Sequence, residues 1–257
     1  MRTKRFGPMD IDETPWPIRS MARATCCRRE KNRVQDCTQQ IFGRPLEVWE
    51  YTGLSGAPNE AVVHVGVLPA GLVLEFRPPH TDDYFARRVV YRVPSGPVLI
   101  DDGLRIFRQA MHRHGLGLRI YLRQVLHASI LGVRHIRAFA TRGLYENGYY
   151  TWPRYGFDGP LPAEVLRRLP RTLSLARSVL DLMETEPGRR WWQKHGTSVA
   201  VQFDLSPSSR SWQVFSQYVA KRLKVVLDDM LSAASRSPCP AQISLPTFAA
   251  SGQTVAS

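Results

Sequence analysis

The stretch "HRHGLGLRIYLRQVLHASILGV", residues His112–Val133, decides how the rest of the chain is interpreted. Residues at helical spacing, most of them apolar, recur from Leu118 to Ile130, which predicts an amphipathic helix. The helix is expected to begin at the glycine pair Gly115 and Gly117. It is expected to end at Gly132, because glycine favours the left-handed conformation that often follows a helix. The stretch therefore predicts a glycine turn followed by a helix.

Extended segments are predicted on both sides of this helix. Runs rich in β-branched residues predict strands at 61–68, 71–77, 84–93, 104–110 and 134–141. Pro69 and Ala70 separate the first two runs, which favours a hairpin. The residues Asp101, Asp102 and Gly103 predict a turn before the fourth strand. The resulting order of strand, glycine turn, helix and strand predicts an α/β fold.

The region after residue 162 is predicted to be mainly helical. Helical periodicity covers residues 163–186, with an interruption at Pro170. A strand is expected at 197–205, and a last helix follows an N-cap at Ser208 or Ser209. At least one of Trp191 and Trp192 is predicted to be buried, because buried aromatic side chains are the commoner case.

Composition divides the chain into four expected parts. They are an N-terminal extension over 1–42 with one helix at 28–42, a central domain over 43–160, a helical C-terminal elaboration packed on it over 161–232, and a tail over 233–257. The tail is rich in serine, alanine and proline and is predicted to be disordered.

The chain of 257 residues is strongly basic, with a net charge of +13. A basic surface can indicate a nucleic-acid partner. Most of the positive charge is arginine scattered along the chain, without a dense basic block, so nucleic-acid binding is the third of three functional hypotheses. Four cysteines at irregular spacing predict free thiols and no metal site. No apolar run has the length of about 20 residues that spans a bilayer, and no secretory signal is apparent, which favours the cytoplasm and no membrane partner.

The glycine turn suits a phosphate group. Backbone N–H groups at a helix start are unpaired and lie at the positive end of the helix dipole, so they bind anions. Arg113 and Arg119 would add positive charge. The sequence is neither a P-loop nor a Rossmann fingerprint, because the residues that complete those motifs are absent. The alternative role for Gly115 and Gly117 is close packing where a strand meets a helix.

The order of motifs over residues 90–159 resembles the GNAT family of acyl-CoA-dependent N-acetyltransferases, as a divergent member. "HRHGLG" stands where that family has Gln/Arg-x-x-Gly-x-Gly/Ala, whose backbone amides bind the CoA pyrophosphate. Asn147 and the pair Gly156-Phe157 stand where the family has Asn…Tyr-x-x-x-Gly-Phe. The resemblance implies a mixed, mainly antiparallel central sheet flanked by helices. It also implies acetyl-CoA or another acyl-CoA as co-substrate, bound by His112, Arg113, His114, Gly115, Leu116, Gly117, Leu118, Arg119, Asn147 and Trp152.

The sequence departs from the family pattern at several positions: Asn147 is two residues closer to Gly156 than usual, and Pro153 would shorten the usual helix. His112 replaces the Gln or Arg, and Trp152 replaces the tyrosine that protonates the leaving thiolate, although an indole cannot act as an acid. Tyr149, Tyr150 and Tyr155 are therefore the candidate acids. The candidate base is Glu75, with His80, Asp101 and Asp102 as weaker alternatives.

The segment 146–162, "ENGYYTWPRYGFDGPLP", concentrates aromatic residues in a stretch expected to be loop-like. It would line the pantetheine arm where two central strands separate, or pack as an aromatic plug between the sheet and the C-terminal helices. We expect acyl transfer from acyl-CoA to an unknown amine. The alternative is a GNAT-like module that binds CoA or a partner without turnover.

Overall fold

The computed structural model describes residues 22–69, 71–107, 115–144 and 146–234, with side chains described up to residue 222. The chain divides into two compact units, residues 1–216 and 217–257. The first unit holds all the described strands and most of the helices. In the second unit, the described residues continue the last helix, and the Arg222 guanidinium lies 5.6 Å from the centre of the Tyr218 ring.

Seven strands form one sheet in the order β1-β2-β3-β4-β5-β6-β7. The strands are β1 (Arg23–Cys26), β2 (Val62–Leu68), β3 (Gly71–Arg77), β4 (Tyr84–Val93), β5 (Gly96–Ile106), β6 (His135–Ala140) and β7 (Val199–Asp204). The pairs β1–β2 and β5–β6 are parallel, and the other neighbours are antiparallel. Helical connections join the parallel pairs, as parallel pairing requires. The protein is therefore α/β, with a mixed sheet flanked by helices.

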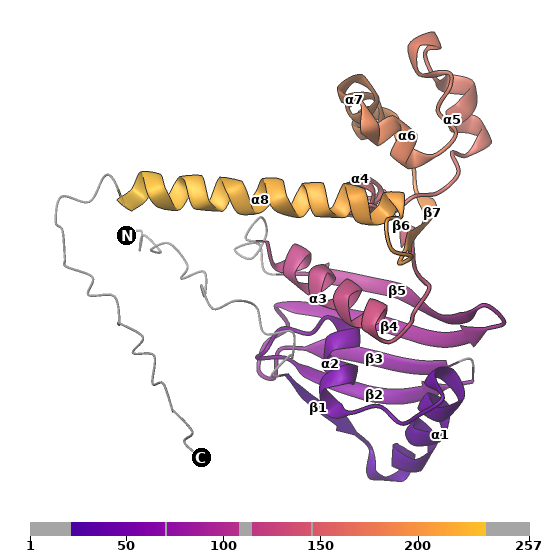
Figure 1. Cartoon of the computed structure of the whole chain (residues 1–257), viewed down its shortest axis with the longest axis vertical. Coiled ribbons are helices and arrows are strands. Elements are labelled where there is room, and N and C mark those ends of the chain that lie inside the picture. Colours follow the sequence, from indigo (N-terminus) through magenta and orange to yellow (C-terminus); the bar gives the residue numbers. More distant parts are fainter. Residues whose placement is uncertain (1–21, 70, 108–114, 145, 235–257) are drawn as a thin grey trace, which may run out of the picture. The chain divides into compact units, whose positions relative to one another are not determined.

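The helices are α1 (Lys31–Phe42), α2 (Val48–Ser55), α3 (Leu116–Ile130), α4 (Gly148–Arg154), α5 (Ala163–Arg168), α6 (Val179–Glu184), α7 (Glu186–His195) and α8 (Arg210–Ala234), with short 3-10 turns at η1 (Arg28–Glu30) and η3 (Arg171–Leu173). Helices α2 and α3 lie over one face of the sheet (Figure 1). The strand side chains beneath them, such as Leu74, Phe76 and Leu99, are fully buried. Burial of this apolar face is the main source of stability for the unit.

Most of the strands and helices confirm the sequence prediction. The helix after the glycine pair spans α3, with Gly132 in the left-handed conformation directly after it. Ser209 accepts a hydrogen bond from the Trp212 N–H through its hydroxyl at the start of α8, as an N-cap does. Trp192 is fully buried, as predicted.

The predicted turn at Asp101–Gly103 is wrong, because β5 runs through it without a break. The pairing of β4 with β5 shifts register between Arg87 and Arg88, which face Gly103 and Asp101. The extra residue, Asp102, is accommodated as a β-bulge, so the strand keeps its hydrogen bonds on both sides of it. Residues 108–110 of the predicted strand lie outside the described residues.

Two further predictions needed correction or extension. The aromatic segment is not loop-like at its start, because Gly148–Arg154 forms α4.

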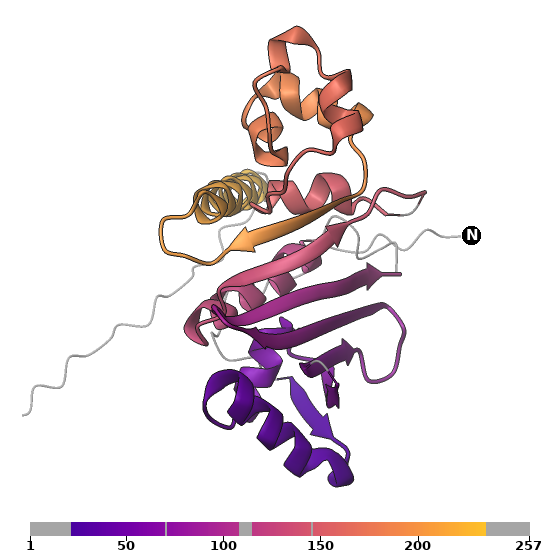
Figure 2. The same ribbon diagram turned by 90° about the vertical axis from the view of Figure 1, so that its right-hand side faces the viewer.

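Strand β1 was not predicted, and it adds a parallel strand from the expected N-terminal extension. At the other edge, β7 lies beside β6 (Figure 2), so the region after residue 160 contributes a strand to the same sheet. The division into parts at residues 42, 160 and 232 stays a prediction.

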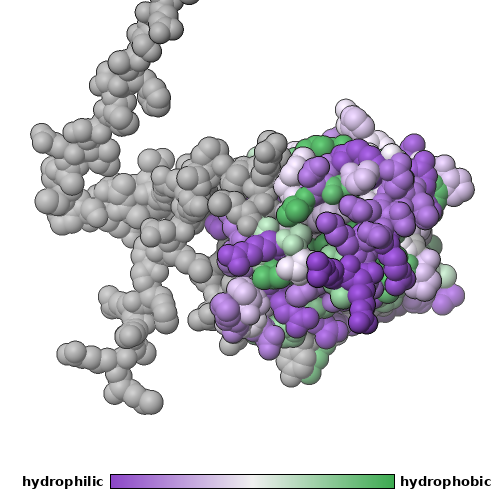
Figure 3. Space-filling model, turned by 90° about the horizontal axis from the view of Figure 1, so that it is seen from below, coloured by the Kyte–Doolittle hydropathy of each residue, from purple (hydrophilic) through white to green (hydrophobic). Residues whose placement is uncertain are grey.

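The side of the molecule that carries α1 is largely hydrophilic, with only small separate apolar patches (Figure 3). Within the described residues, no helix combines the length and the apolar character needed to cross a membrane.

Candidate functional site

The parallel strands β5 and β6 separate along their length. They pair only from Val98 to Asp101 on β5 and from His135 to Ala138 on β6. Beyond these pairs β5 continues to Ile106 and is paired with β4, while the end of β6 is paired with β7. The bulge at Asp102 lies at the point of separation, and bulges bend and twist a strand locally. The sheet is therefore opened between its fifth and sixth strands.

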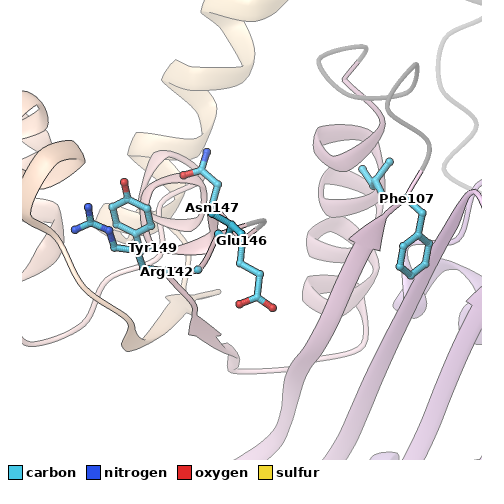
Figure 4. A pocket seen from close by; sticks show the side chains of 8 residues that line it. Phe107, Arg142, Glu146, Asn147 and Tyr149 are labelled. Carbon is cyan, nitrogen blue, oxygen red and sulfur yellow. The ribbon is translucent and has the colours of Figure 1, made fainter.

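An open cavity of about 720 Å³ lies at this separation. One wall is the end of β5, and the other is the segment that follows β6; the lining residues are Ile106, Phe107, Arg142, Gly143, Leu144, Glu146, Asn147 and Tyr149. Figure 4 shows Phe107 on one wall and Arg142, Glu146, Asn147 and Tyr149 on the other. The cavity thus lies between two strands that run parallel up to its base.

The wall after β6 is held by hydrogen bonds to the end of α7 and the residue that follows it. The Arg142 guanidinium donates to the carbonyl oxygens of Gly196 and Lys194, and it lies 5.0 Å from the centre of the Tyr149 ring. The Tyr149 hydroxyl donates to the Gln193 carbonyl oxygen at 2.8 Å. These contacts fix the orientation of both side chains.

The glycine turn lies next to the cavity. Gly115 has φ +77° and precedes α3, a conformation that glycine adopts without strain. Gly117 lies in the first turn of α3, where a Cβ atom, if the residue had one, would be 3.9 Å from Leu104 and 4.0 Å from Ile106. Contacts at this distance are ordinary, so close packing among the described residues does not explain Gly117. Because Ile106 also lines the cavity, the turn and the cavity share a boundary.

A buried ion pair lies at the base of the separation. The Arg88 Nη1 atom is 2.5 Å from an Asp101 carboxylate oxygen, and both side chains are fully buried. Burial raises the pKa of Asp101 to about 6, although Arg88 opposes the change. Burial also raises the pKa of Tyr121, whose hydroxyl is buried nearby. Asp101 is thus shielded from solvent and does not line the cavity.

The candidate base Glu75 is in a different position. Its carboxylate is 3.6 Å from the Arg87 Nε atom, which is also 3.3 Å from an Asp102 oxygen. All three side chains are partly exposed, and none lines the cavity. The carboxylate that does line the cavity is Glu146, which is exposed. The sequence prediction did not include it.

The candidate tyrosines separate into three environments. Tyr149 lines the cavity, whereas Tyr150 lies under the Arg154 guanidinium, 5.5 Å from the ring centre. Tyr155 stacks on Tyr121 with ring centres 5.5 Å apart. Tyr149 is therefore the tyrosine of the three that an occupant of the cavity would contact.

The second half of the aromatic segment is part of the core. Trp152 and Phe157 have ring centres 4.8 Å apart, and both pack against Tyr121 of α3. Phe203 of β7 and Phe215 of α8 complete the cluster around Tyr121. The aromatic plug considered from the sequence is confirmed for these residues. Trp152 packs inside it, whereas Asn147 lines the cavity.

The remaining predicted cofactor residues lie at the start of α3. Leu116, Leu118 and Arg119 are partly exposed in its first turn. His112, Arg113 and His114 lie outside the described residues. Phe107 was missed because it is one apolar residue within the predicted strand 104–110. Arg142, Leu144 and Glu146 were missed because their only sequence signal is that they follow the predicted strand 134–141.

Comparison with known protein families found no match, and comparison with curated proteins found none.

Proposed function

We propose that this protein is a divergent GNAT-like acyltransferase that binds acetyl-CoA or another acyl-CoA. The supporting observation is the separation of β5 from β6 beside a helix start whose glycine, Gly117, is not explained by packing among the described residues. The N–H groups of the first turn of α3 would bind the pyrophosphate. The pantetheine arm would then extend into the cavity between the two strands.

The proposed reaction moves an acyl group from sulfur to nitrogen. A neutral amine attacks the thioester carbonyl carbon, a C–N bond forms, and the C–S bond breaks. The amine loses one proton and the CoA thiolate gains one, so the reaction needs no further reactant. Glu146 is the carboxylate that lines the cavity and is available to accept the proton. Tyr149 is the hydroxyl group in the cavity that would protonate the thiolate.

Binding without turnover is the second candidate function, and two observations favour it. The Tyr149 hydroxyl donates its proton to the Gln193 carbonyl oxygen, so it must leave that bond before it can serve a thiolate. Trp152, at the position of the family's acid, is packed against Phe157 and Tyr121. Release of free CoA from acetyl-CoA in the presence of amines, peptides or aminoglycosides would distinguish the enzyme from the binding module.

The binding step is tested by calorimetry with acetyl-CoA and with desulfo-CoA. Gly117→Glu places a side chain and a negative charge in the turn and should abolish binding. Gly117→Ala controls for the fold: it should raise helix stability by about 0.5–1 kcal/mol, because the added Cβ has room. Ser129→Glu adds the same charge at an exposed position near the other end of α3 and should leave binding unchanged. Absence of any thermal shift with roughly 1 mM acetyl-CoA would refute the proposal.

A further inference from the structure

Large apolar side chains are exposed around the cavity. Phe107 is 58% exposed on the β5 wall, and Leu144 is 88% exposed on the wall after β6. Of the eight large apolar side chains exposed in the described residues, two therefore line this cavity. Grouping of such side chains at one place marks a binding surface more often than single exposed ones do.

The charges around the cavity do not suit a phosphate. Glu146 contributes a carboxylate, which would repel an anion. The cation of the lining, Arg142, is bound by the carbonyl oxygens of Gly196 and Lys194 and stacks on Tyr149. The N–H groups in the first turn of α3, at the positive end of the helix dipole, are the better phosphate site. The cavity is thus suited to the uncharged part of a thioester.

We infer that the cavity accepts an acyl chain longer than acetyl, packed between Phe107 and Leu144. This inference rests on the proposed function and names the substrate class of the same site. An acetyl group has a single methyl group to bury, which leaves most of the exposed apolar surface of the two side chains in water. A longer acyl chain would cover this apolar surface on both walls of the cavity. Each methylene that becomes buried tightens binding about fourfold.

The test is calorimetry on the full chain, without an acceptor, with CoA, acetyl-CoA, butyryl-CoA and octanoyl-CoA. Butyryl-CoA should bind more than about tenfold tighter than acetyl-CoA, because two further methylenes are buried. Octanoyl-CoA should bind at least as tightly as butyryl-CoA. If none of the four compounds binds, the proposed function fails. If CoA and acetyl-CoA bind and affinity does not increase with chain length, only the present inference fails.

Substitution of a matched pair of leucines tests where the acyl chain binds. Leu144 and Leu175 are 88% and 89% exposed, and only Leu144 lines the cavity. Leu144→Ser should lower the preference for butyryl-CoA over acetyl-CoA several-fold. Leu175→Ser should leave this preference unchanged. Equal effects of the two substitutions, or an unchanged preference in Leu144→Ser, would overturn the inference. Because both positions are exposed, both variants are expected to fold, and their melting temperatures check this.

Discussion

The Trp192 Nε1 atom donates a hydrogen bond to the Tyr149 carbonyl oxygen at 2.9 Å. Tyr149 lies in α4, four residues before Pro153, and proline has no N–H to donate to that carbonyl. The indole of α7 therefore replaces the helical hydrogen bond that the proline removes. This contact explains how α4 forms despite its proline, and it fastens the cavity wall to α7.

Trp192→Ala should destabilise the protein by about 3–5 kcal/mol, the usual cost of truncating a buried aromatic side chain. Trp192→Phe should cost less, because it keeps part of the packing and loses the hydrogen bond. Urea denaturation followed by circular dichroism measures both changes. Trp191→Ala is the matched control: Trp191 is partly exposed and contacts the ring of its neighbour His195. Equal losses from Trp191→Ala and Trp192→Ala would contradict the assigned roles.

Breaking the buried ion pair should be strongly destabilising. Arg88→Met leaves the Asp101 carboxylate buried without its partner, and removing one member of such a pair costs about 3–5 kcal/mol. The double substitution Arg88→Met with Asp101→Leu removes both charges and should cost less than Arg88→Met alone. Chemical denaturation at neutral pH gives the three free energies of unfolding. A double variant less stable than the single one would show that the packing, and not the charge, matters.

The same pair predicts a dependence of stability on pH. The pKa of Asp101 is raised from 3.8 to about 6, and burial is the largest cause. The Arg88 charge lowers this pKa, and the Asp102 charge raises it by a smaller amount. The folded protein therefore binds a proton at a higher pH than the unfolded chain does. Its stability relative to Asp101→Asn should increase as the pH falls from about 6 to 4, by up to about 3 kcal/mol. This contribution is complete below about pH 3.8 and lost as the pH rises through about 6.

Denaturation of wild type and Asp101→Asn at about pH 4, 5, 6 and 7 isolates this effect, because the other titrating groups are common to both proteins. The groups that act on Asp101 are Arg88 on β4, Asp102 on β5 and Tyr121 on α3. A difference in stability that does not change over this range would refute a raised pKa.

Local sequence patterns predicted most of the fold. The β2–β3 hairpin, β4, β6 and α3 follow from periodicity and from glycine, and these signals are contained within each segment. The course of β5 was mispredicted because the sequence Asp101-Asp102-Gly103 is typical of a turn. A bulge opposite Arg87 and Arg88 keeps it in the strand, and this depends on a partner strand. Helix α4 was missed for a similar reason. The indole that donates a hydrogen bond to its Tyr149 carbonyl oxygen belongs to Trp192 of α7, which is distant in the sequence.

The candidate site was predicted only where residues close in sequence form it. Gly115, Gly117 and Asn147 could be found from motif spacing. The cavity joins the end of β5 to the segment after β6, so Phe107 and Leu144 come to line one cavity only through the separation of the strands. Asp101 was expected in a turn, and its burial depends on the pairing of β4 with β5.

If the protein is an enzyme, Tyr149→Phe should lower turnover by about a hundred- to ten-thousand-fold, the usual contribution of general acid–base catalysis. Acyl-CoA affinity should change little, because the ring and its contact with Arg142 remain. The measurement is release of free CoA with an identified acceptor. Tyr155→Phe is the control, since Tyr155 stacks on Tyr121 and does not line the cavity. Full turnover in Tyr149→Phe, Tyr150→Phe and Tyr155→Phe alike would mean that no tyrosine of the segment is the acid and that solvent protonates the thiolate. A loss of turnover in Tyr155→Phe alone would identify Tyr155 as the general acid.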